Sequence, residues 1–266
     1  VTKFGKVSVF SDLNNLNDIS LDNDFYNICG ITEDELKDVF EPYVNRLAEA
    51  RKMKQGEAYS ELKRNYDGYH FTEEAPGMYN PFSLLNALHK RSFGSYWFET
   101  GTPSYLVELL KRHDFKLDEL KGNKVTANVL SAIDASSSNP ISVIFQSGYL
   151  TISGYNERYK LYSLDFPNEE VREGFMLYLM PYYTSVSVNK TGFQISCFVE
   201  EVKSGDISGF MTRLESFFAN VPYDLIKDTE NHYQNVLFIL CNLCGLYTKA
   251  EFHTSNGRVD MTIETP

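Results

Sequence analysis

The sequence predicts an α+β fold that is mainly helical and multidomain. Three observations support this prediction: helical periodicity dominates the first half, a hairpin pattern interrupts it near residue 150, and two strand patterns close the chain. The length of 266 residues corresponds to about two domains at roughly 150 residues each.

The first 50 residues predict a short strand followed by a long helix. Residues 4–10 alternate apolar and polar, as a strand does, and the Asn- and Asp-rich stretch 12–24 predicts a loop or a short helical turn. Thr32 and Glu35 form a capping-box pattern. One amphipathic helix follows, with apolar residues at helical spacing: Leu36, Val39, Phe40, Tyr43, Val44 and Leu47.

Further helices follow up to about residue 135. One is expected over about 56–65. Asn80-Pro81 is a helix cap followed by a first-turn proline, and Thr102-Pro103 repeats the device before a leucine-rich stripe. Residues 136–140 form the clearest linker.

The second half begins with a short predicted helix over 141–147 and two strands at 150–152 and 159–164, joined as a hairpin. Residues 166–170 open another helix, so this region fits a winged-helix arrangement. Helices near 194–203 and 206–219 follow, the second with one apolar face (Ile207, Phe210, Met211, Leu214, Phe217 and Phe218). A last helix starts at Asp228-Thr229 and ends at Gly245, before strands at 246–253 and 257–264.

Composition narrows the class of protein. The charge of 25 − 36 = −11 argues against a surface that coats phosphate backbones, although a local basic groove stays possible. Four cysteines indicate no disulfide framework, so we expect a reducing, cytoplasmic location. Neither a membrane span nor a signal peptide is expected.

Cys241 and Cys244 form a C-x-x-C pair on an apolar helix face, which favours core packing over zinc or redox chemistry.

The last helix and strand carry the candidate catalytic residues. Glu230 begins the helix, at the edge of its apolar stripe, and Asp260 lies in the final strand. A helical Glu facing a hairpin Asp is how metal-dependent nucleases gather carboxylates for Mg²⁺. The alternative is structural: Glu230 as a helix N-terminal charge and Asp260 as a strand-end carboxylate.

Several segments together resemble a known bacterial family. They are 1–16, Tyr66-Asp67-Gly68-Tyr69-His70-Phe71, 79–86, 96–103, 146–152, 166–171, 230–234 and Gly257-Arg258-Val259-Asp260. The family comprises AAA-ATPase-like proteins with a C-terminal PD-(D/E)XK nuclease-like domain. The resemblance implies four parts: the last strand and loop of an ATPase core (1–30), a helical lid (31–135), a winged-helix-like segment (136–187), and helices plus the N-terminal half of a nuclease-like domain (188–266).

The resemblance also implies site residues and cofactors. Thr2 falls near the sensor position of the ATPase, Glu230 on the helical glutamate and Asp260 on the metal-binding aspartate of the nuclease. ATP and Mg²⁺ are implied for the parent protein, with nucleic acid as its substrate. Both chain ends look like cuts through a longer protein: no phosphate-binding loop is present, and Glu264 is followed by Thr265-Pro266 where the family has E-x-K.

We therefore expect this chain to be catalytically inactive alone and to bind neither cofactor tightly. One alternative is a helical module that binds or regulates a protein partner, which the net charge favours over DNA. Another is a degenerate nuclease-like domain that is only structural.

Overall fold

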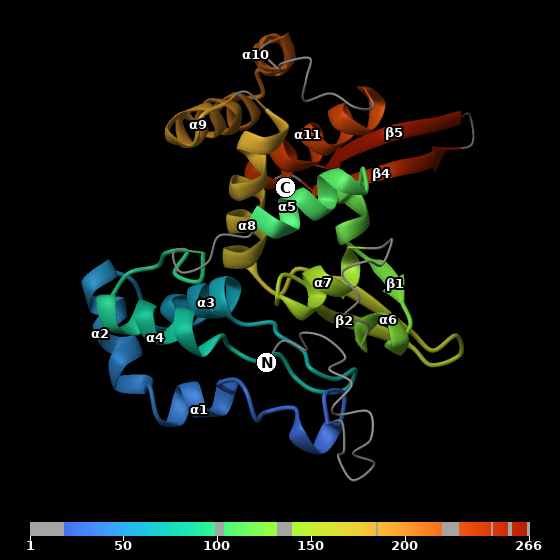
Figure 1. Cartoon of the computed structure of the whole chain (residues 1–266). Helices are drawn as coiled ribbons and strands as arrows, with labels where there is room; N and C mark the ends of the chain where they lie inside the picture. The colour runs from blue at the N-terminus through green and yellow to red at the C-terminus, as the bar shows by residue number, and fades with distance from the viewer. Residues whose placement is uncertain are drawn as a thin grey trace. The chain divides into compact units, whose positions relative to one another are not determined.

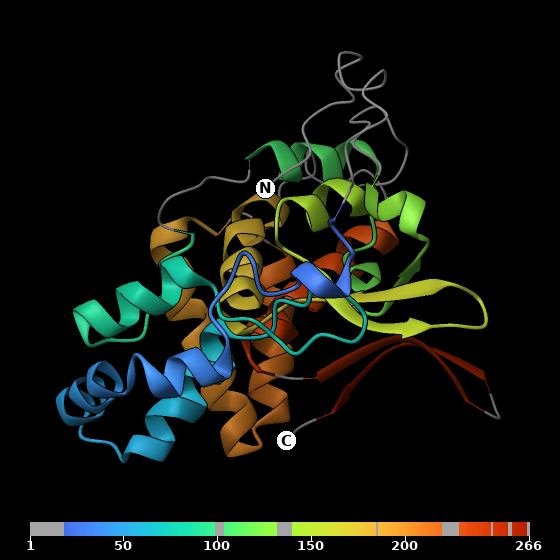
Figure 2. The same cartoon turned by 90° about the horizontal axis from the view of Figure 1, so that it is seen from below.

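The computed structural model (Figures 1 and 2) describes residues 19–98, 104–131, 140–184, 186–219, 229–245, 247–254 and 257–264. The predicted strand at 4–10, Thr2 and the Thr102-Pro103 cap lie outside this part of the chain. The fold is α+β and mostly helical, as predicted. It divides into two compact units: residues 1–106 with 120–172, and residues 107–119 with 173–266. The finer four-part division stays a prediction.

The first unit begins with a helical group. After a short 3-10 turn, η2 (Asn23–Phe25), come α1 (Glu33–Asp38), α2 (Glu41–Arg51), α3 (Gln55–Tyr66) and α4 (Pro81–Lys90). The expected capping box of Thr32 and Glu35 is present, and the Asn80 side chain accepts from the first turn of α4. Their apolar faces share one core of twelve buried residues: Leu36, Val44, Leu47, Ala48, Ala58, Leu62, Tyr66, Tyr79, Leu84, Ala87, Leu88 and Tyr96.

The prediction of one helix over the 36–47 stripe was wrong. The chain breaks at Val39 and Phe40 and restarts as α2 with Pro42 in its first turn. A proline lacks the N–H that an uninterrupted helix would use and clashes with the preceding turn, so the helix ends before it. In consequence Val39 and Tyr43 are exposed instead of sharing the core.

The rest of the first unit is a small antiparallel sheet with two short helices. The element order is β1 (Asn123–Val125), α6 (Ala127–Ser131), α7 (Ile141–Gln146), β2 (Thr151–Asn156) and β3 (Leu161–Asp165), and the strands lie in the order β1-β3-β2. The hairpin and α7 were predicted, whereas β1 was not. The register shifts between Ile152 and Gly154, a bulge that leaves Ser153 without a partner in the ladder.

The second unit contains most of the remaining helices. The helices α5 (Ser104–Arg112) and α8 (Glu169–Tyr183) and the 3-10 turn η3 (Leu117–Leu120) run across the unit boundaries. Next come α9 (Val188–Ser204), α10 (Ile207–Ala219), α11 (Thr229–Leu243) and the hairpin β4 (Tyr247–Thr254) and β5 (Gly257–Glu264). Figure 1 shows α11 beside this hairpin, and α11 packs against β4.

The second unit follows the predicted order, with two differences. The helix α9 starts six residues before the expected 194. On α10, Leu214 and Phe217 are buried as predicted, whereas Ile207 and Met211 are exposed. Within the described residues, no helix is long and apolar enough to cross a membrane.

Candidate functional site

The structure places the two predicted carboxylates on successive elements of the second unit. Glu230 lies in the first turn of α11, and its side chain is exposed. We expected it at the edge of the buried face, but Asn231 and His232 take the buried positions beside it. Asp260 lies in the middle of β5, where the backbone is described and the side chains are not.

The register of the β4–β5 hairpin sorts its residues into two faces. Ala250 pairs with Met261 and Phe252 with Val259, so Asp260 lies opposite Glu251. Because alternate residues of a strand share a face, one face collects polar positions and the other apolar ones. The mainly polar face holds Tyr247, Lys249, Glu251, His253, Arg258, Asp260, Thr262 and Glu264, and the other holds Thr248, Ala250, Phe252, Thr254, Gly257, Val259, Met261 and Ile263.

The polar face offers carboxylate positions of the type that Mg²⁺ binds. Asp260 and Glu251 lie opposite each other, and Glu264 is on the same face four residues along β5. Carboxylate oxygens are hard ligands, which Mg²⁺ prefers, so the residue types fit this ion. Elsewhere in the chain, the residues with described side chains form no cluster of three potential metal ligands.

Two buried asparagines hold α11 to the connection that follows α5. The side chain of Asn235 accepts from the Leu117 amide at 2.8 Å and donates to the Phe115 carbonyl at 3.0 Å. One turn earlier, the side chain of Asn231 donates to the Asp114 carbonyl at 2.8 Å. These amides satisfy backbone groups that would otherwise be buried without partners. The helix that carries Glu230 is therefore fixed in the second unit by uncharged hydrogen bonds.

His232 lies between these two asparagines and is also buried. Its ring stacks on that of Tyr183, with centroids 6.3 Å apart. Burial, and then the charge of Lys111, lower the pKa of His232 below its ordinary value. The ring is therefore held in its neutral form, and it fills space in the unit beside α8.

The cysteines at the end of α11 and just after it, Cys241 and Cys244, are packing residues. Cys241 is buried, as predicted for the core, and Cys244 is half-buried. Burial raises the pKa of Cys241 to about 12 and that of Cys244 to about 11. Both therefore stay protonated at neutral pH, which disfavours their use as thiolate nucleophiles or ligands.

In the first unit, several distinctive sequence motifs meet at one place. Gly68 has φ +104°, and a Cβ there would overlap the Pro167 carbonyl oxygen, so only glycine permits this approach. The Trp97 amide donates to the buried carboxylate of Glu170 at 2.9 Å. The rings of Trp97 and Tyr149 are 4.8 Å apart. These close contacts join the helical group to the start of α8.

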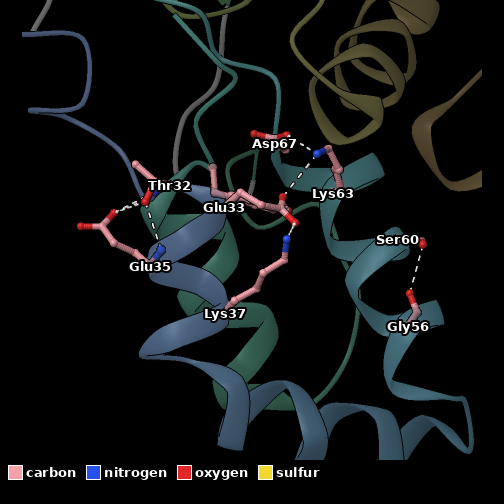
Figure 3. A network of polar contacts seen from close by, with 9 residues as sticks. Thr32, Glu33, Glu35, Lys37, Gly56, Ser60, Lys63 and Asp67 are labelled. Carbon is pink, nitrogen blue, oxygen red and sulfur yellow. Dashed lines mark hydrogen bonds and ion pairs between the residues drawn. The ribbon is translucent and has the colours of Figure 1, made fainter.

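A charged network lies beside this junction (Figure 3). The carboxylate of Glu33 accepts from the Tyr79 hydroxyl at 2.8 Å and pairs with Lys37 at 3.1 Å and Lys63 at 3.3 Å. Lys63 also lies 3.9 Å from Asp67. Burial acts to raise the pKa of Glu33, but the hydrogen bonds from Tyr79 and Lys37 and the charge of Lys63 outweigh it, so the pKa is lowered. Burial raises the pKa of Asp67.

Sequence patterns alone did not single out Asn231, His232 and Asn235. The i, i+4 spacing of the two asparagines is a weak signal, since the same spacing is common on exposed helix faces. Their partners lie more than 110 residues earlier in the chain. A local pattern contains no information about such contacts.

Comparisons with known proteins give one informative relative. The chain is 36% identical over 277 residues to a protein of Azotobacter chroococcum mcd 1 described as "Uncharacterized protein in vnfD 5'region". The alignment covers 99% of this chain and 50% of that protein, so the chain spans about half the length of the relative. No protein-family model matches the chain. No solved structure matches it.

Proposed function

We propose that this chain is part of a longer protein that acts on nucleic acid and that α11, β4 and β5 supply the first part of a PD-(D/E)XK-like nuclease domain. The observation that carries the proposal is the β4–β5 register, which puts Asp260 opposite Glu251 in a hairpin that follows α11, the helix with Glu230 in its first turn. The 36% identity to a protein about twice as long agrees with a longer parent.

In this proposal Asp260 holds Mg²⁺, with Glu251 or Glu264 as a further oxygen ligand from the same face. The ion, when bound, supplies a Lewis acid that stabilises charge on a phosphodiester. The residues of this chain would support that ion through α11, which Asn231 and Asn235 fix by hydrogen bonds. An E-x-K motif on a further strand completes the site in the resembling family, so the proposal assigns cleavage to the longer protein.

The element order supports the remaining parts of the proposal. A strand, two helices and a hairpin, with β1 beside β3, is the order of winged-helix domains. The lid expected over 31–135 would then be confined to its earlier helices, α1 to α4, because β1 pairs with β3 of the hairpin segment. The chain contains no phosphate-binding loop, so its own residues do not fit a bound nucleotide. ATP is therefore assigned to the part of the parent that carries such a loop, with Thr2 near its sensor position.

Cleavage by the longer protein tests the proposal. We expect Mg²⁺-dependent cleavage of DNA or RNA by the parent and a loss of about a hundredfold or more in Asp260→Asn, because a metal ligand contributes at least as much as its supporting shell. Glu215→Gln is the matched control, since Glu215 is exposed on α10, away from the hairpin. Full activity in Asp260→Asn would reject the assignment.

A protein-binding module is the second candidate, because α9 and α10 expose large apolar side chains. Phe193, Ile207 and Met211 are 69%, 75% and 56% exposed. They accompany a largely polar groove of about 990 Å³ between the two helices. If this function is the main one, Ile207→Gln with Met211→Gln abolishes complex formation by the full protein, and the parent shows no cleavage.

A further inference from the structure

The tip of the β2–β3 hairpin has a composition unlike the rest of this acidic chain. Residues 157–160 are Glu157, Arg158, Tyr159 and Lys160, and all four are exposed. Tyr159 is 62% exposed, which is unusual for a large aromatic residue. In both views the loop that joins β2 to β3 extends beyond α6 and α7 of the same unit.

Local contacts define the conformation of this tip. The Asn156 side chain accepts from the Tyr159 amide at 3.1 Å, and Lys160 adopts a left-handed φ of 52°. The guanidinium of Arg158 lies over the Tyr159 ring, 5.5 Å from its centroid. In the second strand pair from the loop, the rings of Tyr155 and Tyr162 are 4.6 Å apart. The tip is therefore an ordered aromatic platform with a cation on each side.

The two helices of the same segment offer no comparable surface. The sequences of α6 and α7, ANVLS and ISVIFQ, contain no charged residue. In α7, Ile141, Ser142 and Ile144 are buried, and the Gln146 side chain donates to the Leu130 carbonyl. A helix of this kind has no side chains to read base edges or to neutralise phosphates. Among β1, α6, α7, β2 and β3, the cationic side chains lie on the strands and the loop of the hairpin and not on the two helices.

One further cation lies on the neighbouring strand. Lys124 of β1 is exposed and pairs in register with Ser163 of β3, three residues after Lys160. Gly154 of β2 pairs with Ser163 from the other side. The row of paired residues Lys124, Ser163 and Gly154 therefore combines two small residues with a lysine on the edge strand.

We propose that the tip formed by Arg158, Tyr159 and Lys160 binds single-stranded nucleic acid. The two cations contact backbone phosphates, Lys124 extends the contact along the sheet, and the Tyr159 ring stacks on an unpaired base. This deepens the proposed function, since it assigns the contact with the substrate to the hairpin and not to α7. The net charge of −11 and Glu157 keep this binding weak, which suits a site that positions a substrate.

The salt dependence of binding gives the sharpest test. Fluorescence anisotropy of a short labelled oligothymidylate, measured with the full chain in a chelator and at several salt concentrations, reports binding without cleavage. With three contacts, the log–log slope is expected at about −2, and Arg158→Gln with Lys160→Gln should make it shallower by about 1.4. Tyr159→Ala should weaken binding about tenfold with little change of slope.

Matched variants separate a local site from general charge. Arg51→Gln with Lys203→Gln removes the same charge at exposed positions outside the sheet, and it should leave affinity and slope unchanged. Glu157→Gln should tighten binding a few-fold by removing a like charge at the tip.

Three outcomes would overturn the proposal: no binding by the wild-type chain, equal losses in the two double variants, or duplex binding as tight as single-strand binding. The assay involves neither metal nor cleavage. A result that rejects nucleic-acid binding by the tip therefore does not affect the nuclease assignment of Asp260. Conversely, an inactive parent whose tip still binds oligothymidylate would refute only the nuclease assignment.

Discussion

The two hairpins of this protein share a topology and differ in nearly everything else. The β2–β3 hairpin has a third strand, a bulge and a cationic aromatic tip. The β4–β5 hairpin has two described strands, an unshifted register, one mainly polar face and one mainly apolar face. A two-stranded hairpin is marginal by itself in water, so the second depends on what packs against its apolar face.

We propose that the two hairpins have different roles. The first hairpin is anchored within its own unit, through Thr151, and its free end offers charges to a ligand. The second carries its carboxylate positions in the middle of the strands, next to α11. We therefore expect the first hairpin to bind substrate and the second to hold the catalytic ion, each supported by a different set of buried polar contacts.

The largest effect is expected where α11 is fixed. Asn235→Leu should lower the stability of the second unit by about 3 kcal/mol, because the buried Leu117 amide and Phe115 carbonyl both lose their partner. Amide hydrogen exchange of α11, followed at increasing urea concentration, measures this loss of stability. Asn242→Leu is the control, since the Asn242 side chain donates to the Phe238 carbonyl within its own helix. Equal losses of stability in the two variants would contradict the proposed role of Asn235 in fixing α11.

A smaller effect is expected at the anchor of the first hairpin. The Thr151 hydroxyl accepts from the His70 amide at 2.7 Å and donates to the His70 carbonyl at 3.1 Å. Thr151→Val keeps the shape and removes both bonds, so we expect a loss of about 2 kcal/mol in the first unit. Exchange at β2 and β3 should rise. The exposed Thr212→Val should change little, and faster exchange at β4 instead of β2 would refute the assignment.

The stability of the second unit should depend on pH through His232. The pKa of His232 is lowered in the folded state by burial and by Lys111. Below its ordinary pKa of about 6.5, the unfolded chain takes up a proton that the folded chain resists, so the second unit loses stability as the pH falls from 7 to 5. His232→Gln should flatten this dependence. An unchanged slope in that variant would locate the titrating group elsewhere.

The smallest effect is expected in the charged network of the first unit. The pKa of Glu33 is lowered, so its contribution is present above about pH 4.5 and is lost as the pH falls through the folded-state pKa. Glu33→Gln should cost less than about 1 kcal/mol near neutral pH, because the pairs with Lys37 and Lys63 are largely exposed. Urea denaturation at pH 7 and at pH 4 checks both statements.

Local signals predicted much of the fold. Asn80-Pro81 predicted the start of α4, and the alternation after residue 246 predicted both strands of the last hairpin. The break between α1 and α2 was missed because the apolar stripe continues through Pro42. The three residues of β1 are too few to form a pattern, and this strand exists because β3 supplies its partners.

The candidate site could be predicted only in part. Glu230 and Asp260 stay predictions from motif resemblance, and the hairpin register adds Glu251 as the position opposite Asp260. The burial of Asn231, His232 and Asn235 depends on the backbone of residues 114–117, which no local pattern connects to α11.

Steady-state cleavage by the longer protein compares the two hairpins in one assay. Our account predicts that Asp260→Asn lowers kcat about a hundredfold or more, whereas Arg158→Gln with Lys160→Gln raises KM and leaves kcat nearly unchanged. An Asp260→Asn enzyme with wild-type kcat, or a tip variant that loses kcat with KM unchanged, would contradict the division between a substrate-binding hairpin and a metal-holding one.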